Sequence, residues 1–274
     1  MDFRAYAAQP DDELDLLLGA LLIAKDARPA LELSAIDAQL DALAAPLVGR
    51  HLRHLPALVQ ARALADQLFV REGFHGNKAD YYDPRNSFLD EVLTRRTGIP
   101  ISLSVVYVEV ARRVGVTASP VGFPGHFLVR IDDQDQRRLM IDPFHGGNVL
   151  TDAALTDLLK RSGSAVTYGE ELIVPTPVRH VIARMLMNLR GIYSMRGEHA
   201  RLLVVFDRLI DLLPNSAEEL RDRGFLFARL GAPGAAVSDL QRYLELFPDA
   251  EDADAVQRWM ERIAETAKRG TPSS

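Results

Sequence analysis

The chain has 274 residues, of which 47% are hydrophobic and 26% charged, so it can form one large or two modest domains with a real core. The formal net charge is −6 and the basic residues form no stripe, which argues against a nucleic-acid-binding protein. The chain contains no cysteine, which excludes disulfides and thiol chemistry and fits a reducing cytoplasm.

The N-terminal segment, MDFRAYAAQPDDELD, is acidic and lacks the basic-then-apolar order of a signal peptide. The longest nearly apolar run, Leu16 to Ala24, is about half of what a membrane span needs. We therefore expect a cytoplasmic protein without a membrane segment.

Three helices are predicted in the first seventy residues. Asp11 to Lys25 carries leucines at helical spacing, a second helix begins at Ser34 and ends near Pro46, and a third covers His54 to Phe69. Together they are expected to form a helical N-terminal layer.

Residues 71–87 are rich in Gly, Asn, Asp and Pro, which predicts a long loop of the kind that often carries function. Ser87 is a candidate cap for a short helix from Phe88 to Arg96, and Gly98 would close that helix.

The segment from Ser102 to Val114 is apolar on more than one side and predicts a buried central helix. Aliphatic and aromatic residues then predict three strands, at Thr117–Gly122, Phe127–Asp132 and Arg138–Asp142. The polar turn at 132–136 indicates that the last two form an antiparallel hairpin. A helix at Asp152–Ser162 follows.

The last third of the chain repeats itself. Pro214 and Pro248 lie 34 positions apart, and Ala183–Ser216 aligns with Ala217–Ala250. A 34-residue period with paired helices and a closing proline is the tetratricopeptide pattern. A capping helix is expected at Glu251–Lys268.

The loop that contains Pro175 and Pro177 separates the two parts. We therefore expect a domain at residues 1–174 with the N-terminal helices, and a helical repeat domain at residues 178–270.

A hydroxyl, a histidine and an aspartate lie at the edges of the predicted central elements. Ser102 lies at the start of the central helix, His126 precedes a strand, and Asp142 ends the next one. This is the chain order of a nucleophile, its general base and the carboxylate that orients the base. A helix N-terminus cannot ionise a hydroxyl as it can a thiol, so Ser102 would depend fully on His126 for activation.

Each candidate also fits a structural role. Ser102 is a favoured helix-cap residue, and Asp142 before a proline is a common turn former. His126 also fits a structural histidine. His145 adds a D-x-x-H spacing with Asp142, but two ligands without a further cluster do not predict a metal site. We expect neither a metal nor a cofactor.

These segments together resemble the SirB family of bacterial proteins, which join a transglutaminase-like core to tetratricopeptide repeats. The resemblance implies an α+β, transglutaminase-like core, in which His126 and Asp142 match the family's histidine and aspartate. The superfamily's nucleophilic cysteine maps to Ser102 or to one of the two residues before it. The family name implies a role in regulating invasion in some bacteria. The motifs that carry the resemblance are Gly76-Asn77, Tyr81–Ser87, Gly98–Leu103, Val110–Arg113, Gly122–Arg130 and Asp142–Phe144.

Two functions follow as hypotheses. In the first, the protein is a noncatalytic or regulatory module that keeps a degenerate triad cleft for a peptide-like ligand and contacts a protein partner through its repeats. In the second, it is a serine-dependent amide or ester hydrolase or acyltransferase that uses Ser102, His126 and Asp142. The sequence favours no oligomeric state.

Overall fold

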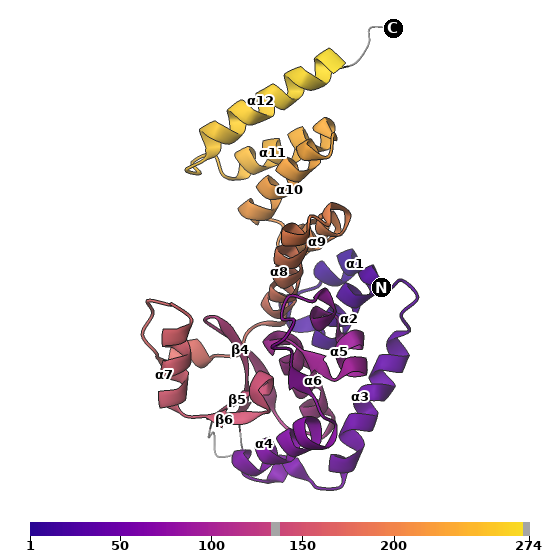
Figure 1. Ribbon diagram of the computed structural model, residues 1–274, viewed down its shortest axis with the longest axis vertical. Coiled ribbons are helices and arrows are strands. Elements are labelled where there is room, and N and C mark those ends of the chain that lie inside the picture. The colour runs from indigo at the N-terminus through magenta and orange to yellow at the C-terminus, as the bar shows by residue number, and fades with distance from the viewer. Residues whose placement is uncertain (133–137, 271–274) are drawn as a thin grey trace. The chain divides into compact units, whose positions relative to one another are not determined.

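The computed structural model describes residues 1–132 and 138–270, and its elements are drawn in Figure 1. The chain forms two compact units. The mixed unit contains Gln9–Asn188, and the helical unit contains Phe3–Ala8 together with the chain from Leu189 onward. The order of elements is an α+β part followed by helix pairs, as predicted.

The mixed unit begins with the three predicted helices, α2 (Leu16–Ala27), α3 (Leu33–Val48) and α4 (Ala57–Ala65). Helix α2 begins later than predicted because the side chain of Asp15 accepts the backbone N–H of Leu18 at 2.7 Å and so caps the helix there. The residues before it form a separate 3-10 turn, η1 (Asp11–Glu13).

Helix α4 continues directly into a π-helical turn, η3 (Asp66–Arg71), which the sequence did not predict. Its Phe69 ring stacks on Tyr107 of the central helix, with ring centroids 6.3 Å apart. A Cβ atom on Gly147 would lie 2.7 Å from the Phe69 ring, so this turn packs tightly against the chain that follows the third strand of the sheet.

The predicted long loop contains a short strand and a 3-10 turn, β1 (His75–Gly76) and η4 (Pro84–Ser87). Helix α5 (Leu89–Arg95) follows, and β1 pairs in parallel with β2 (Thr97–Gly98). The central helix α6 (Pro100–Arg113) begins at its proline, a favoured residue for the first helical position. Every residue from Pro100 to Ala111 is buried, as predicted for a central helix.

A four-stranded antiparallel sheet follows in the order β3 (Ala118–Phe123), β4 (His126–Asp132), β5 (Arg138–Asp142) and β6 (Asn148–Leu150). The antiparallel pairing of β4 with β5 is confirmed, whereas residues 133–136 of the predicted turn lie outside the described residues. The sequence did not predict β6. Helix α7 (Asp152–Arg161) and α6 lie on opposite sides of the sheet (Figure 1).

One core cluster joins the sheet to α7. Its buried members come from the first three strands, from α7 and from the turn η6 (Glu170–Ile173). They are Val121, Phe123, Leu128, Met140, Leu155, Leu159 and Ile173. This packing holds β4 and β5 side by side and so fixes the position of the strand ends at which His126 and Asp142 lie.

The helical unit contains the end of α8 (Val178–Arg196) and four further helices, α9 (His199–Leu212), α10 (Ala217–Arg229), α11 (Pro233–Leu246) and α12 (Ala253–Gly270). Gly197 and Gly231, which the repeat alignment makes equivalent, both end a helix with positive φ angles, 65° and 74°. This agreement supports the predicted 34-residue repeat.

A short helix near the N-terminus, α1 (Phe3–Ala7), belongs to the helical unit and was not predicted. The guanidinium of Arg208 on α9 lies 5.3 Å from the centre of the Phe3 ring. The two compact units meet inside α8, after Asn188, rather than in the proline-containing loop. The boundaries at 174 and 178 therefore stay a prediction. Among the described residues, none of the helices combines the length and apolar character that crossing a bilayer requires.

Candidate functional site

His126 and Asp142 form the centre of the candidate site. His126 begins β4 and Asp142 ends β5. Because these two central strands are antiparallel neighbours, both residues lie at the same end of the strand pair. The Nε2 atom of His126 is 3.0 Å from Oδ1 of Asp142, and both side chains are nearly inaccessible to solvent. The structure thus brings together two of the three predicted site residues.

His145 is a third member that the sequence did not place in the site. Its Nδ1 atom is 2.7 Å from Oδ2 of Asp142, and its backbone N–H donates to Oδ1 at 3.2 Å. The cause is local, because Asp142 caps the 3-10 turn η5 (Pro143–His145). The D-x-x-H spacing was the available signal, but it did not show that both histidines share one carboxylate.

The Asp142 carboxyl is held in its ionised form. Burial alone would raise its pKa, but the hydrogen bond and charge of His126, and then those of His145, outweigh burial and keep the pKa below its usual value. The pair of imidazoles therefore faces a carboxylate that carries its charge at neutral pH.

Ser102, the third predicted site residue, hydrogen-bonds to backbone groups and not to the histidine–aspartate pair. Its Oγ atom donates to the carbonyl oxygen of Asn86 at 2.6 Å and accepts the backbone N–H of Ile99 at 3.1 Å. The hydroxyl is fully buried, and all its hydrogen-bond partners among the described residues are backbone groups. The structure does not join it to His126 by a hydrogen bond, and its catalytic role remains a prediction.

The contacts that connect Ser102 with His126 run through two glycines and a ring. A Cβ atom on Gly98 would lie 2.7 Å from the Ser102 hydroxyl, and Gly98 pairs with Gly76 across β2 and β1. A Cβ atom on Gly76 would lie 2.5 Å from the Phe144 ring, which in turn makes an edge contact with His126. Glycine is needed at both positions because Ser102 and Phe144 lie so close to the backbone of the two short strands that no Cβ atom fits between them.

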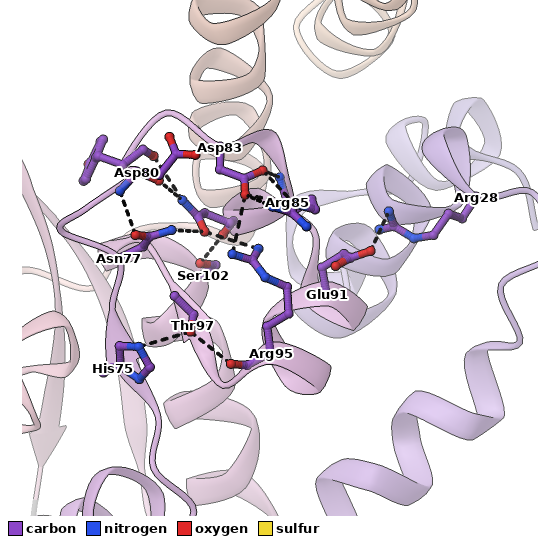
Figure 2. Close-up of polar contacts among 12 residues, drawn as sticks. Arg28, His75, Asn77, Asp80, Asp83, Arg85, Glu91, Arg95, Thr97 and Ser102 are labelled. Atoms are coloured by element: carbon purple, nitrogen blue, oxygen red, sulfur yellow. Dashed lines mark hydrogen bonds and ion pairs between the residues drawn. The ribbon is translucent and has the colours of Figure 1, made fainter.

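The loop before α5 is tied down by Asn86. Its side-chain amide donates to the carbonyl of Asp80 at 2.8 Å and accepts from the amide of Asn77 at 3.1 Å (Figure 2). The same residue supplies the carbonyl that holds Ser102. The Ser102 hydroxyl therefore belongs to a network that shapes this loop.

Two tyrosines of this loop stand beside the candidate site. The Tyr81 ring makes edge contacts with Tyr82 at 5.4 Å and with Phe144 at 6.1 Å. Burial, and then the neighbouring Tyr82, raise the pKa of Tyr81 above its usual value. Tyr82 is largely exposed. Both residues belong to a motif that carried the family resemblance, but no role in the site was predicted for them.

A hollow of about 580 Å³ reaches Asp142 from the side of α7. Apart from Asp142, its lining comes from β6 and α7 and includes acidic, basic and apolar side chains. These residues are Leu150, Ala154, Asp157, Leu158, Lys160 and Arg161. Asp142 thus contributes to the wall of this hollow although its side chain is buried.

A second pocket, of about 250 Å³, lies within the repeats of the helical unit. Its basic residue Arg190 is held by Glu219 at 2.9 Å and by Asp222 at 2.6 Å. Arg229 lies exposed at its margin. The pocket is lined by Arg190, Ser194, His199, Leu202, Phe206, Asp222, Phe225, Leu226 and Arg229.

A buried central helix, an antiparallel sheet with a histidine–aspartate pair at its edge and a following set of paired helices define a transglutaminase-like protein with tetratricopeptide repeats. A family model described as the transglutaminase-like superfamily matches residues 34–187, and one described as a tetratricopeptide repeat matches residues 189–261. The chain belongs to the transglutaminase-like superfamily.

The chain is similar to several curated proteins along most of its length. It is 37% identical to a UPF0162 protein of Xylella fastidiosa (strain 9a5c) over 267 residues, covering 93% of this chain and 92% of the relative. A UPF0162 protein of Vibrio cholerae is 28% identical over 249 residues, covering 90% and 91%. Human F-box only protein 21 is 31% identical over 265 residues, covering 84% of this chain and 41% of the human protein. The predicted resemblance is confirmed for the transglutaminase-like core and the repeats.

Proposed function

We propose that this protein is a noncatalytic, regulatory protein-binding module of the SirB family. It keeps the histidine–aspartate cleft of its superfamily for a peptide-like ligand and contacts a protein partner through its repeats. The observation that carries the proposal is the commitment of the Ser102 hydroxyl to backbone groups of Asn86 and Ile99 in a fully buried position. A nucleophile needs a free hydroxyl within reach of its base and of a substrate.

The repeats support the binding half of the proposal. Tetratricopeptide helices stack into surfaces that commonly contact other proteins. The pocket in the helical unit combines apolar walls, such as Phe206 and Phe225, with charged residues at its margin. Such a surface suits a peptide that carries both apolar and charged side chains. A cytoplasmic location, which the lack of cysteine favours, belongs to the same proposal.

A fluorophosphonate probe tests the noncatalytic half. We expect no adduct on Ser102 when the purified full chain is incubated with a broad panel of such probes and digested for mass spectrometry. Ser102→Ala and Ser104→Ala provide matched controls for labelling at other sites. An adduct on Ser102 that disappears only in Ser102→Ala would establish an activated serine.

The binding half needs a test of the repeat pocket. Arg229→Glu reverses a charge at the pocket margin, whereas Arg62→Glu makes the same change at an exposed residue of α4, far along the sequence. Proteins that copurify with the full chain from its own cells are quantified for both variants. We expect specific partners to be lost from Arg229→Glu and kept by Arg62→Glu. If both variants recovered the same partner proteins in equal amounts, the pocket would not be the site of partner binding.

One observation favours serine-dependent hydrolysis or acyl transfer as a second function. The His126–Asp142 pair is intact and has the geometry of a base with its orienting carboxylate. For Ser102 to act with it, the hydroxyl would have to leave both of its backbone partners. The probe experiment therefore separates the two functions directly.

A further inference from the structure

Three side chains with metal-binding atoms converge where β4 begins and β5 ends. His126 Nε2 and His145 Nδ1 lie 3.0 Å and 2.7 Å from the two oxygens of Asp142, and the ligand atoms of the three residues all lie within 4.8 Å of one another. His126 comes from β4, whereas Asp142 and His145 come from the end of β5 and the turn after it.

The chemistry of this donor set is specific. Two imidazole nitrogens and one carboxylate oxygen suit zinc and its neighbours among the divalent first-row transition metals, rather than calcium or magnesium, which prefer oxygen alone. Around a tetrahedral ion with bonds of about 2.0–2.1 Å, adjacent ligand atoms are about 3.3 Å apart. The two histidine–aspartate separations, 3.0 and 2.7 Å, are somewhat shorter than this value, and all three ligand atoms lie within 4.8 Å of one another, so modest side-chain rotations would bring them around one ion.

The burial of the three residues differs in a way that suits such a site. The side chains of Asp142 and His126 are only 4% and 8% exposed, whereas that of His145 is 42% exposed. Two ligands are therefore held in place by the protein, and the third can turn toward an incoming ion. The hollow beside α7 is lined in part by Asp142, and the exposed His145 side chain gives the cluster a second approach from solvent.

The same atoms hydrogen-bond to one another in the metal-free arrangement. Each imidazole donates an N–H to Asp142, so binding an ion requires both rings to carry their proton on the other nitrogen. Each ring gives up the proton on the nitrogen that faces Asp142 and takes one on its other nitrogen, so the number of bound protons is unchanged while two N–H···O hydrogen bonds are exchanged for three metal bonds.

We propose that His126, Asp142 and His145 form a binding site for a divalent transition-metal ion of the zinc class. Three protein ligands leave the fourth position of a tetrahedral ion for water or for an oxygen of a bound molecule. The sequence predicted no metal because Asp142 and His145 supply only two ligands. The third ligand comes from another strand and reaches them through the pairing of β4 with β5.

Metal titration of the full chain tests this site. The protein is purified without a histidine tag, treated with a chelator and titrated with ZnCl₂ by calorimetry and with CoCl₂ by visible absorption. We expect one Zn²⁺ per chain, a tetrahedral Co²⁺ spectrum, and a rise in the thermal unfolding midpoint with saturating Zn²⁺.

His145→Ala is the decisive variant, because it removes an exposed ligand and leaves the buried pair in place. We expect it to weaken Zn²⁺ binding by at least roughly tenfold and to abolish the Co²⁺ spectrum. His180→Ala removes an exposed histidine of the same unit and should bind as the wild type does. Asp142→Asn should also lose binding, with circular dichroism to verify its fold.

Two results would overturn the proposal. One is the lack of stoichiometric Zn²⁺ binding to the wild type, and the other is the same affinity in His145→Ala as in the wild type. Because His145→Ala leaves the core untouched, its result can be interpreted even if Asp142→Asn unfolds.

Discussion

The Ser102 hydroxyl and the Asp142 carboxylate are both buried, yet they serve different structures. Ser102 joins the start of α6 to the loop before α5 through Ile99 and Asn86. Asp142 joins two imidazoles at the edge of the sheet. A polar group that is buried must find partners inside the protein, and the identity of those partners separates a structural serine from a site carboxylate.

Replacing Ser102 tests its structural role. Ser102→Ala leaves a buried N–H and a buried carbonyl without their partner, so we expect a loss of about 1–3 kcal/mol in the free energy of unfolding. Ser104→Ala is the matched control, because Ser104 is equally buried but donates only to the carbonyl of Pro100 in its own helix. Urea unfolding of both variants is the measurement. Equal costs at the two positions would show that the Ser102 network adds nothing.

Asp83 makes stability depend on pH. Burial alone would raise the pKa of its carboxyl, but hydrogen bonds from the side chain and backbone of Arg85, and then the charges of Arg85 and Arg95, keep the pKa below its usual value. A lowered pKa in the folded state stabilises the protein above the unfolded value of about 4, and this contribution is lost as pH falls through the folded pKa.

We therefore expect Asp83→Asn to be less stable than the wild type at pH 7, by about 1 kcal/mol, and the difference to shrink as pH falls below about 4. Urea unfolding between pH 3 and pH 7 measures the difference. A wild type and a variant with parallel stability curves over this range would contradict the assigned role of Asp83.

At the scale of the elements, α10 and α11 pack through a glycine. A Cβ atom on Gly224 would lie 2.8 Å from the side chain of Leu240 and 3.3 Å from Asp239. Gly224 lies within α10, the first helix of its repeat, where the tetratricopeptide pattern has a small residue, and this contact gives the reason. In the preceding repeat Arg190 takes this position, and its side chain forms ion pairs with Glu219 and Asp222.

Gly224→Ala should push the two helices apart and cost about 1–3 kcal/mol. Gly191→Ala is a control in α8, where an added Cβ meets nothing within 4 Å and the substitution should instead stabilise the helix by up to about 1 kcal/mol. Thermal unfolding followed by circular dichroism compares the two. A Gly224→Ala protein as stable as the wild type would show that the helices tolerate a wider separation.

At the scale of the whole molecule, each unit has its own core. The cluster that joins the sheet to α7 shares no residue with the cluster of the repeats. The buried members of the repeat cluster are Ile210, Leu220, Leu240, Tyr243 and Val256. Separate cores allow one unit to open while the other stays protected.

Leu240→Ala should therefore destabilise the repeats selectively. Removing a fully buried leucine costs about 2–5 kcal/mol, and we expect faster hydrogen exchange in α10, α11 and α12 with unchanged protection in β4. Hydrogen exchange read by mass spectrometry resolves these segments. Faster exchange in β4 would show that the two cores unfold as one.

The longer elements could be predicted from the sequence because their periods are local. The spacing of leucines placed α2, α3 and α4, and the 34-residue repeat placed the helix pairs of the helical unit. The strand β6 and the helix α1 escaped prediction because three and five residues are too short to show a period. The π-helical turn η3 was not predicted because hydrophobic spacing does not distinguish it from a continuation of α4.

The amino-acid sequence alone was enough to indicate an α+β core, the repeats and the pairing of His126 with Asp142, because periodicity and the ends of adjacent strands are encoded in neighbouring residues. Only the tertiary structure revealed the hydrogen-bond partners of Ser102 and the position of His145 beside His126. Ser102 is satisfied by a carbonyl sixteen residues away, and His145 reaches His126 only because β4 and β5 pair. Contacts between distant segments depend on how the elements pack in three dimensions, which no local pattern of residues specifies.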